Sequence, residues 1–148
     1  MAFHWIANIF PFSRLGLFHY IVARKLKVES ASNPSFSIIV PARNEAGTIE
    51  KIVETLPALG SFTELVFVEG NSTDNTFAEI ERVAKLYTGK RRIIYARQSG
   101  KGKGDAVRRG FELAQGDILT IYDADMTVPP EDLAKFYRAL VTNRGEFI

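Results

Sequence analysis

The segment Phe36-Ser37-Ile38-Ile39-Val40-Pro41 decides the fold of this 148-residue chain. It is a short apolar run rich in branched residues, which predicts a buried strand that Pro41 ends. A strand that reads as a nearly continuous apolar run is buried on both faces, as parallel strands flanked by helices are.

Three further strands follow in the same manner, each separated from the next by an amphipathic helix. The strands are predicted at residues 65–68, 92–95 and 118–122, and the helices at residues 49–56, 77–87 and 107–114, with a last helix that Pro129 and Pro130 begin. This alternation predicts an α/β fold with a doubly wound, mostly parallel sheet and flanking helices. Ligands of such sheets bind beyond the carboxyl ends of the strands, so the residues after each strand are the candidates for a site.

Composition narrows the chemistry that such a site can carry. The chain has no cysteine, and its two histidines, His4 and His19, lie near the N-terminus. Disulfides, thiolate metal sites and a cysteine nucleophile are therefore excluded, and catalysis in the main body depends on carboxylates, lysines, backbone amides or a hard metal ion. The net charge of +2 is too small to indicate a nucleic acid partner, and we expect none.

The N-terminal part divides into a hydrophobic, aromatic arm at residues 1–28 and a small, polar linker at residues 29–35. The arm holds no uncharged apolar run of membrane-spanning length and no signal peptide pattern. Two interpretations stay open. The arm packs against protein, or it makes a peripheral contact with a membrane. We expect a cytoplasmic location, at the cytoplasmic face of the membrane in the second case.

The main domain is assigned to residues 36–148, and its last four residues resemble the turn and opening of another strand. We expect the sequence to be incomplete at its C-terminus, because the start of a strand alone buries little surface.

Acidic residues follow the first two strands. Glu45 comes shortly after Pro41, near the start of a helix. Glu69 ends the second strand, where the acidic residue of a dinucleotide-binding fold contacts ribose hydroxyls. Gly70 allows a tight turn, and polar residues of that turn are predicted to cap the next helix, namely Ser72, Thr73 and Asp74.

The third strand is followed by the segment Arg97-Gln98-Ser99-Gly100-Lys101-Gly102-Lys103-Gly104-Asp105. Glycines at alternate positions let backbone amides approach a ligand, and the lysines and the helix start add positive charge. This combination predicts a site for a phosphate or diphosphate. The segment is not a Walker A loop, and a flexible, solvated basic loop is the alternative interpretation.

The fourth strand delivers Asp123-Ala124-Asp125 to the same edge. In an extended backbone, residues two apart point to one side, so both carboxylates are predicted to face the crevice. Close carboxylates repel each other unless a cation lies beside them. Mg²⁺ or Mn²⁺ binds through one or two carboxylates together with phosphate oxygens, so the pair predicts a metal site. An exposed acidic turn is the alternative.

Taken in order, the motifs of this chain resemble those of family 2 glycosyltransferases with the GT-A fold. The segments that carry the resemblance are Val40-Pro41-Ala42-Arg43-Asn44-Glu45, residues 69–76, residues 102–110, Ala114-Gln115-Gly116-Asp117 and Asp123-Ala124-Asp125. Within that family, the Gly-Lys-Gly loop and the Asp-Ala-Asp-Met segment are most similar to polyprenyl-phosphate (dolichol-phosphate) mannosyl- and glucosyltransferases.

The resemblance implies an inverting enzyme that takes a sugar from a UDP- or GDP-sugar and transfers it to an acceptor, such as a polyprenyl phosphate or a saccharide. It implies a Mg²⁺ or Mn²⁺ ion held by Asp125 and Asp123. The family's catalytic base lies downstream of the fourth helix, so we assign none from the residues present. The implied nucleotide contacts come from Pro41, Ala42, Glu45, Glu69, Lys103 and Asp123.

Other functions stay open beside this one. Gly70 stands where the family usually has a second acidic residue, which leaves the choice between UDP and GDP undecided. A non-catalytic nucleotide-binding fragment is one alternative. A sugar nucleotidyltransferase is another, although its glycine- and lysine-rich loop usually follows the first strand, where this chain has Ala42-Arg43-Asn44-Glu45.

Overall fold

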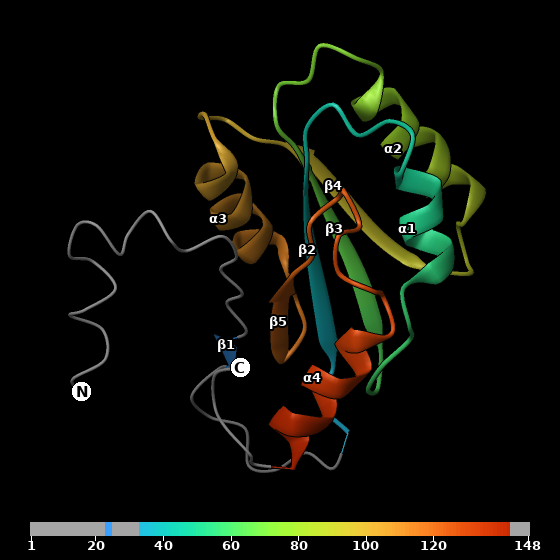
Figure 1. The fold of residues 1–148 in the computed structure, drawn as a ribbon, viewed down its shortest axis with the longest axis vertical. Coiled ribbons are helices and arrows are strands. Elements are labelled where there is room, and N and C mark those ends of the chain that lie inside the picture. The colour runs from blue at the N-terminus through green and yellow to red at the C-terminus, as the bar shows by residue number, and fades with distance from the viewer. Residues whose placement is uncertain (1–22, 25–32, 143–148) are drawn as a thin grey trace, which may run out of the picture.

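The computed structural model describes residues 23–24 and 33–142, which form one sheet with helices on both faces (Figure 1). Four parallel strands lie in the order β5-β2-β3-β4, and a short antiparallel strand, β1, pairs with β5 at the edge. The doubly wound, mostly parallel sheet predicted from the sequence is therefore confirmed. The strands are β1 (Ala23–Arg24), β2 (Phe36–Ala42), β3 (Thr63–Glu69), β4 (Arg92–Arg97) and β5 (Ile118–Ile121).

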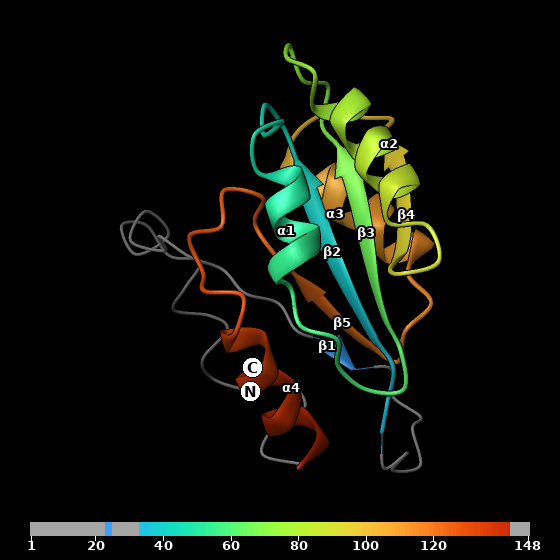
Figure 2. The same ribbon diagram turned by 90° about the vertical axis from the view of Figure 1, so that its right-hand side faces the viewer.

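The helices divide between the two faces of the sheet as the chain direction requires. From β2 the chain moves outward through β3 to β4 and then returns to β5 on the other side of β2. Figure 2 shows α1 and α2 in front of the strands and α3 behind them. The strand order therefore reverses between β2 and β5, and ligands bind at such a switch point. The helices are α1 (Ile49–Thr55), α2 (Thr76–Leu86), α3 (Lys103–Leu113) and α4 (Asp132–Val141).

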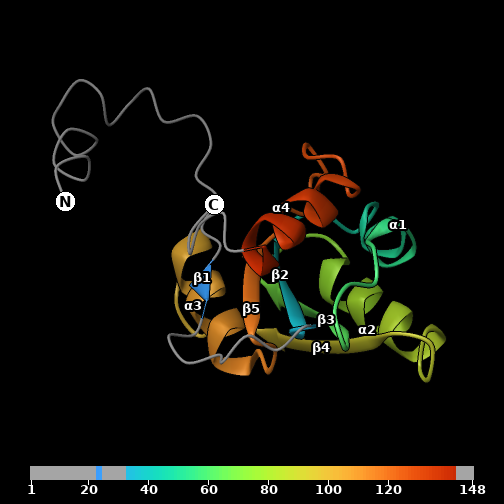
Figure 3. The same ribbon diagram turned by 90° about the horizontal axis from the view of Figure 1, so that it is seen from below.

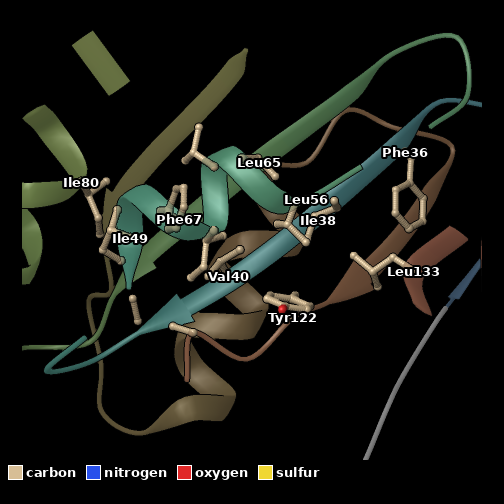
Figure 4. Packing of buried hydrophobic residues seen from close by; sticks show 14 of the residues in the cluster. Phe36, Ile38, Val40, Ile49, Leu56, Leu65, Phe67, Ile80, Tyr122 and Leu133 are labelled. Atoms are coloured by element: carbon tan, nitrogen blue, oxygen red, sulfur yellow. The ribbon is translucent and has the colours of Figure 1, made fainter. Parts of the chain in front are cut away.

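β2 is buried on both faces, as the sequence predicts. Phe36, Ile38 and Val40 pack on the face that carries α1, α2 and α4, and Figure 4 shows them among the other residues of this cluster. Ile39 points to the opposite face and packs with Ala106 of α3. Because successive side chains of a strand alternate between faces, this one strand contributes to both cores.

Helix α4 lies beside β2 and β5 when the molecule is seen from below (Figure 3). The rings of Phe36 and Tyr137 meet edge to face with centroids 5.5 Å apart, and the Tyr137 hydroxyl donates to the carbonyl of Pro34 at 2.8 Å. α4 begins at Asp132, two residues after Pro130. The two prolines instead form a turn before the helix, in which their carbonyls accept hydrogen bonds from the amides of Asp132 and Leu133.

The prediction that Pro41 ends the strand is wrong. β2 continues to Ala42, and Pro41 pairs with Val68 of β3. β5 pairs with β2 only as far as Ile39, whose carbonyl accepts a hydrogen bond from the Tyr122 amide at 2.8 Å. The N–H and C=O groups of successive residues in a strand point to alternate neighbours, so those of Ile39 and Pro41 point to the β5 side. Pro41 lacks an N–H there, but β5 has already ended at that level, so no hydrogen bond is lost.

Strand β1 is an element that the sequence did not predict, and it lies in the N-terminal arm. The rest of the arm, most of the linker and the predicted strand at the C-terminus lie outside the described residues. Among the helices that the structure does describe, none combines the length and apolar character needed to cross a membrane.

A buried carboxylate organises the amino ends of the strands. Glu64 is fully buried, accepts a hydrogen bond from the Ser37 hydroxyl at 2.6 Å, and forms an ion pair with Arg92 at 3.0 Å. The Gly116 amide donates to the same hydroxyl at 2.8 Å. The segment Ala114-Gln115-Gly116-Asp117, which contributes to the family resemblance, therefore stabilises the end of the sheet opposite the ligand edge.

Close packing of α3 on β2 generates a prediction about Gly110. A Cβ added at Gly110 would lie 2.3 Å from Cγ2 of Ile39, so Gly110→Ala must push the helix from the sheet. We expect a loss of about 1–3 kcal/mol in the free energy of unfolding, measured by urea denaturation.

Gly104, in the same helix, is the matched control, because a Cβ there meets nothing within 4 Å. Gly104→Ala is expected to be neutral or to stabilise by up to about 1 kcal/mol. Equal effects of the two substitutions would contradict the close contact between α3 and β2.

Candidate functional site

A cavity of about 300 Å³ lies at the carboxyl ends of the strands, where the strand order reverses. Every residue that the sequence nominated for the site lines this cavity except Glu69. The cavity therefore brings together residues from the end of β2 and from the segments after β2, β3, β4 and β5. The lining residues are Pro41, Ala42, Arg43, Glu45, Gly70, Gln98, Gly102, Lys103, Ala106, Asp123, Ala124 and Asp125.

An ion pair joins two of the predicted motifs across the cavity. Nζ of Lys103 lies 2.5 Å from Oδ1 of Asp123. Lys103 is the first residue of α3, and Gly102 before it has a φ of 83°, a conformation that glycine adopts without strain. The glycine-lysine loop and the acidic segment thus face the same space, as the sequence predicts.

The two aspartates reach the cavity by a route that the sequence did not predict. The segment is a turn rather than an extended strand, since the Met126 amide donates to the Asp123 carbonyl at 3.1 Å and Met126 has a φ of 57°. Oδ1 of Asp125 accepts the Thr127 amide at 3.0 Å. The pairing of β5 with β2 ends at Ile121, so the chain can turn soon after that residue. The prediction of an extended pair is therefore wrong, although both aspartates line the cavity.

Glu45 adds a third carboxylate to this edge. Burial, and then the negative charges of Asp125 and Asp74, raise its pKa above the ordinary value of 4.5. The Glu45 amide donates to the Thr76 hydroxyl at 2.8 Å, which fixes the backbone there. The cavity wall therefore combines three carboxylates with the positive charge of Arg43, Lys103 and the start of α3.

The loops after β2 and β3 are joined to each other. Oδ1 of Asn44 accepts the Thr73 amide at 2.8 Å, and the Asn44 amide donates to the Ser72 hydroxyl at 3.0 Å. The prediction that Ser72 and Thr73 cap α2 is therefore wrong, because both are used by the neighbouring loop. Asp74 alone acts near the helix start, accepting the Thr76 amide at 2.9 Å.

The glycine-lysine loop is also held on both sides. The Gly100 amide donates to Oδ2 of Asp105 at 2.8 Å, and its carbonyl accepts from the Asn71 side chain at 3.2 Å. A Cβ at Gly100 would lie 2.7 Å from the Asp105 carboxylate, so a larger residue there would displace the side chain that accepts the Gly100 amide. These contacts argue against the alternative of a flexible basic loop.

Glu69 is buried and is not among the residues that line the cavity. Its carboxylate accepts a hydrogen bond from the Ser72 amide, and its carbonyl accepts the Gln98 amide at 2.9 Å. In the structure it therefore closes the turn after β3. A direct contact between Glu69 and a nucleotide stays a prediction.

Gln98 lines the cavity, but the sequence reasoning did not nominate it. It is the first residue after β4, and the strand-end rule that found the other residues also applies to it. The glycines and lysines of the same segment form a stronger pattern, so the uncharged Gln98 does not stand out in the sequence.

Most of the chain matches one known protein family. Residues 37–147 match the family model described as Glycosyl transferase family 2. The chain belongs to this family. The family resemblance expected from the sequence is therefore confirmed.

Relatives within glycosyl transferase family 2 include two dolichol-phosphate mannosyltransferases. That of Saccharomyces cerevisiae is 34% identical over 110 residues, which covers 71% of this chain and 40% of the relative. That of Pyrococcus furiosus is 34% identical over 106 residues, which covers 70% of this chain and 29% of the relative. The chain thus spans well under half the length of these relatives.

Solved structures show the same fold. A mannosyltransferase from Pyrobaculum calidifontis, solved with GDP-Man and Mn²⁺, has a TM-score of 0.61 and 25% identity, covering 93% of this chain and 38% of its own. Glucosyl-3-phosphoglycerate synthase from Mycobacterium tuberculosis, solved with UDP and Mn²⁺, has a TM-score of 0.59 and 24% identity, covering 76% of this chain and 42% of its own. The GT-A fold expected for this glycosyltransferase domain is confirmed.

The carboxylates of the site generate a prediction about titration. In metal-free buffer, the pKa of Glu45 measured by NMR is expected to lie above 4.5. Asp125→Asn removes one of the negative charges that raise this pKa, so it should lower the measured value. Asp132→Asn, in α4, is the control and should leave the Glu45 pKa unchanged. Equal values in all three proteins would contradict the proximity of Glu45 and Asp125.

The same shift predicts how Glu45 affects stability. The folded chain binds this proton more tightly than the unfolded chain, so the Glu45 carboxylate lowers the stability of the fold as the pH rises above its ordinary pKa of 4.5. Glu45→Gln should therefore raise the unfolding temperature at about pH 7, and the gain should vanish below about pH 4. A gain of the same size at both pH values would contradict the raised pKa.

Proposed function

We propose that this glycosyltransferase domain binds a UDP- or GDP-sugar through a divalent metal and forms the donor-binding part of an inverting enzyme. The observation that carries the proposal is that Lys103, at a helix start, lines the same cavity as Asp123 and Asp125 and forms an ion pair with Asp123. A diphosphate needs positive charge and backbone amides, and its metal needs carboxylates, so this cavity offers both to the same ligand.

The residues fit a Mg²⁺ or Mn²⁺ ion only together with a diphosphate. Within residues 23–24 and 33–142, no group of three or more acidic or histidine side chains could hold a metal ion, and Asp123 is already paired with Lys103. Mg²⁺ ordinarily combines one or two carboxylates with substrate phosphate oxygens, which is what Asp125 and Asp123 would provide. The Pyrobaculum structure with GDP-Man and Mn²⁺ supports this interpretation.

Each side of the cavity has its own part in the proposed reaction. The start of α3 and the charge of Lys103 hold the diphosphate. Pro41 and Ala42 form the wall beside the nucleoside. The metal, when bound, stabilises the negative charge that grows on the nucleoside diphosphate as it leaves.

The acceptor and the location belong to the same proposal. Similarity to two dolichol-phosphate mannosyltransferases supports a polyprenyl phosphate as the acceptor, with a saccharide as the alternative. A cytoplasmic location at the membrane face stays a prediction, because most of the arm on which it rests lies outside the described residues. The family match argues against a sugar nucleotidyltransferase. A non-catalytic fragment would bind the same donor, so binding is the first property to measure.

Calorimetry with UDP and GDP, each with and without Mn²⁺, tests the proposal. We expect metal-dependent binding of at least one of the two. Asp125→Ala should abolish the dependence on metal, because the ion loses the carboxylate that is free of Lys103. Asp132→Ala, outside the cavity, is the control and should bind as the unaltered chain does. Binding that is equal without metal, or unaffected by Asp125→Ala, would falsify the assignment.

The ion pair between Lys103 and Asp123 generates a second expectation. Without nucleotide, Lys103 competes with the metal for the Asp123 carboxylate. When a diphosphate binds, Lys103 pairs with the diphosphate instead. Lys103→Met should therefore strengthen Mn²⁺ binding in the absence of nucleotide by up to about fivefold, since an exposed ion pair is worth about 0–1 kcal/mol. The same substitution should weaken nucleotide binding.

Lys101, in the same loop but not in the cavity wall, offers a matched control. Lys101→Met lowers the net charge equally and should change neither affinity. Opposite effects of Lys103→Met on metal and nucleotide, measured by calorimetry, distinguish this competition from a general loss of charge. A parallel loss of both affinities would show that Lys103 does not compete with the metal.

A further inference from the structure

Gln98 is an uncharged polar residue in the wall of a cavity whose other polar side chains are charged. It follows β4, and its amide donates to the carbonyl of Glu69 at 2.9 Å, which anchors its backbone beside the end of β3. This bond therefore fixes the backbone of Gln98 at the edge of the sheet that forms the site.

The side chain of Gln98 is buried but not fully hydrogen-bonded. The residue is 8% exposed, and its Oε1 has no hydrogen-bond partner within the part of the chain that the structure describes. A buried polar atom without a partner costs free energy, so few occur in native proteins. A ligand in the cavity would supply the partner that Oε1 lacks within the described residues.

The location of Gln98 indicates which part of a ligand it meets. The ends of β4 and β5 lie at opposite sides of the parallel strands, and Asp123 and Asp125 follow β5. Neighbouring strands are about 4.8 Å apart, so three spacings separate these ends. The proposed function puts the metal and diphosphate at the β5 side, which leaves the β3 and β4 side of the cavity for the nucleoside. There the cavity is lined by Gly70, which has no side chain, and by Gln98.

We propose that the carboxamide of Gln98 hydrogen-bonds to the edge of the donor's nucleobase and so determines which nucleotide the domain prefers. This inference rests on the proposed function. A carboxamide offers both an acceptor and two donor hydrogens, and a half-turn of the amide exchanges them, so it can match a base edge. A site that hydrogen-bonds its ligand discriminates strongly against a ligand lacking the matching group.

Gln98→Met tests the inference, because methionine keeps the length of the side chain and removes its hydrogen bonds. The full 148-residue chain is titrated calorimetrically with UDP, GDP and inorganic pyrophosphate in the presence of Mn²⁺. We expect the preferred nucleoside diphosphate to lose about tenfold or more in affinity, the expected effect of a lost ligand hydrogen bond at a buried site. The other nucleotide and pyrophosphate should change by less than about twofold, within the ordinary scatter of such substitutions.

Thermal unfolding without ligand separates this role from a structural one. Replacing an unpartnered buried polar group by an apolar group of similar shape is nearly neutral or stabilising, so the unfolding temperature of Gln98→Met should not fall. A clear fall would overturn the inference, because it would show that Gln98 serves the fold.

The binding results distinguish failure of this inference from failure of the proposed function. If the unaltered chain binds neither nucleotide, the proposed function is wrong and the inference falls with it. If the unaltered chain binds but Gln98→Met weakens UDP, GDP and pyrophosphate by the same factor, or weakens none, the base contact is wrong and the proposed function stands. Equal losses for the two nucleotides with unchanged pyrophosphate would move the contact to the ribose and also overturn the inference.

Discussion

The pairing of β2 with a parallel strand on each side is the constraint on which the rest of the structure depends. On one side the Ala42 carbonyl accepts the Gly70 amide at 2.8 Å, and on the other the Ile39 carbonyl accepts the Tyr122 amide at 2.8 Å. These two bonds fix where the chain leaves the sheet after β3 and β5. The acidic turn and the loop after β3 therefore stand at either side of the end of β2, and the cavity between them follows.

Hydrogen bonds between loops then give the cavity a rigid wall. The three non-glycine residues with positive φ, among those described, are Asn44, Asn71 and Met126, and each lies in a loop that follows a strand. Such conformations cost of order 1 kcal/mol and persist only where the surroundings hold them. The side chains of Asn44 and Asn71 both bond to a neighbouring loop, so the residues that bear the strain also supply the links that maintain it.

Position, rather than residue type, separates the structural acids from those of the site. Glu64 lies at the amino ends of the strands, where Ser37 and Arg92 satisfy it, and it stabilises the sheet. Glu45 lies at the carboxyl ends, where its neighbours are other carboxylates and its pKa is raised. The same residue type therefore supports the sheet at one edge and carries a perturbed pKa at the ligand edge, where functional sites generally have such groups.

The sequence by itself determined the alternation of strands and helices, the buried faces of β2 and the strand ends that carry the site, because hydrophobic period and strand direction are local properties. Only the tertiary structure decided where the side chains at those ends point. Asp123 and Asp125 share a turn, Glu69 turns inward to Ser72, and Gln98 enters the cavity wall. Each of these depends on where strand pairing stops or on contacts with residues outside its own element, and neither is encoded in a local pattern.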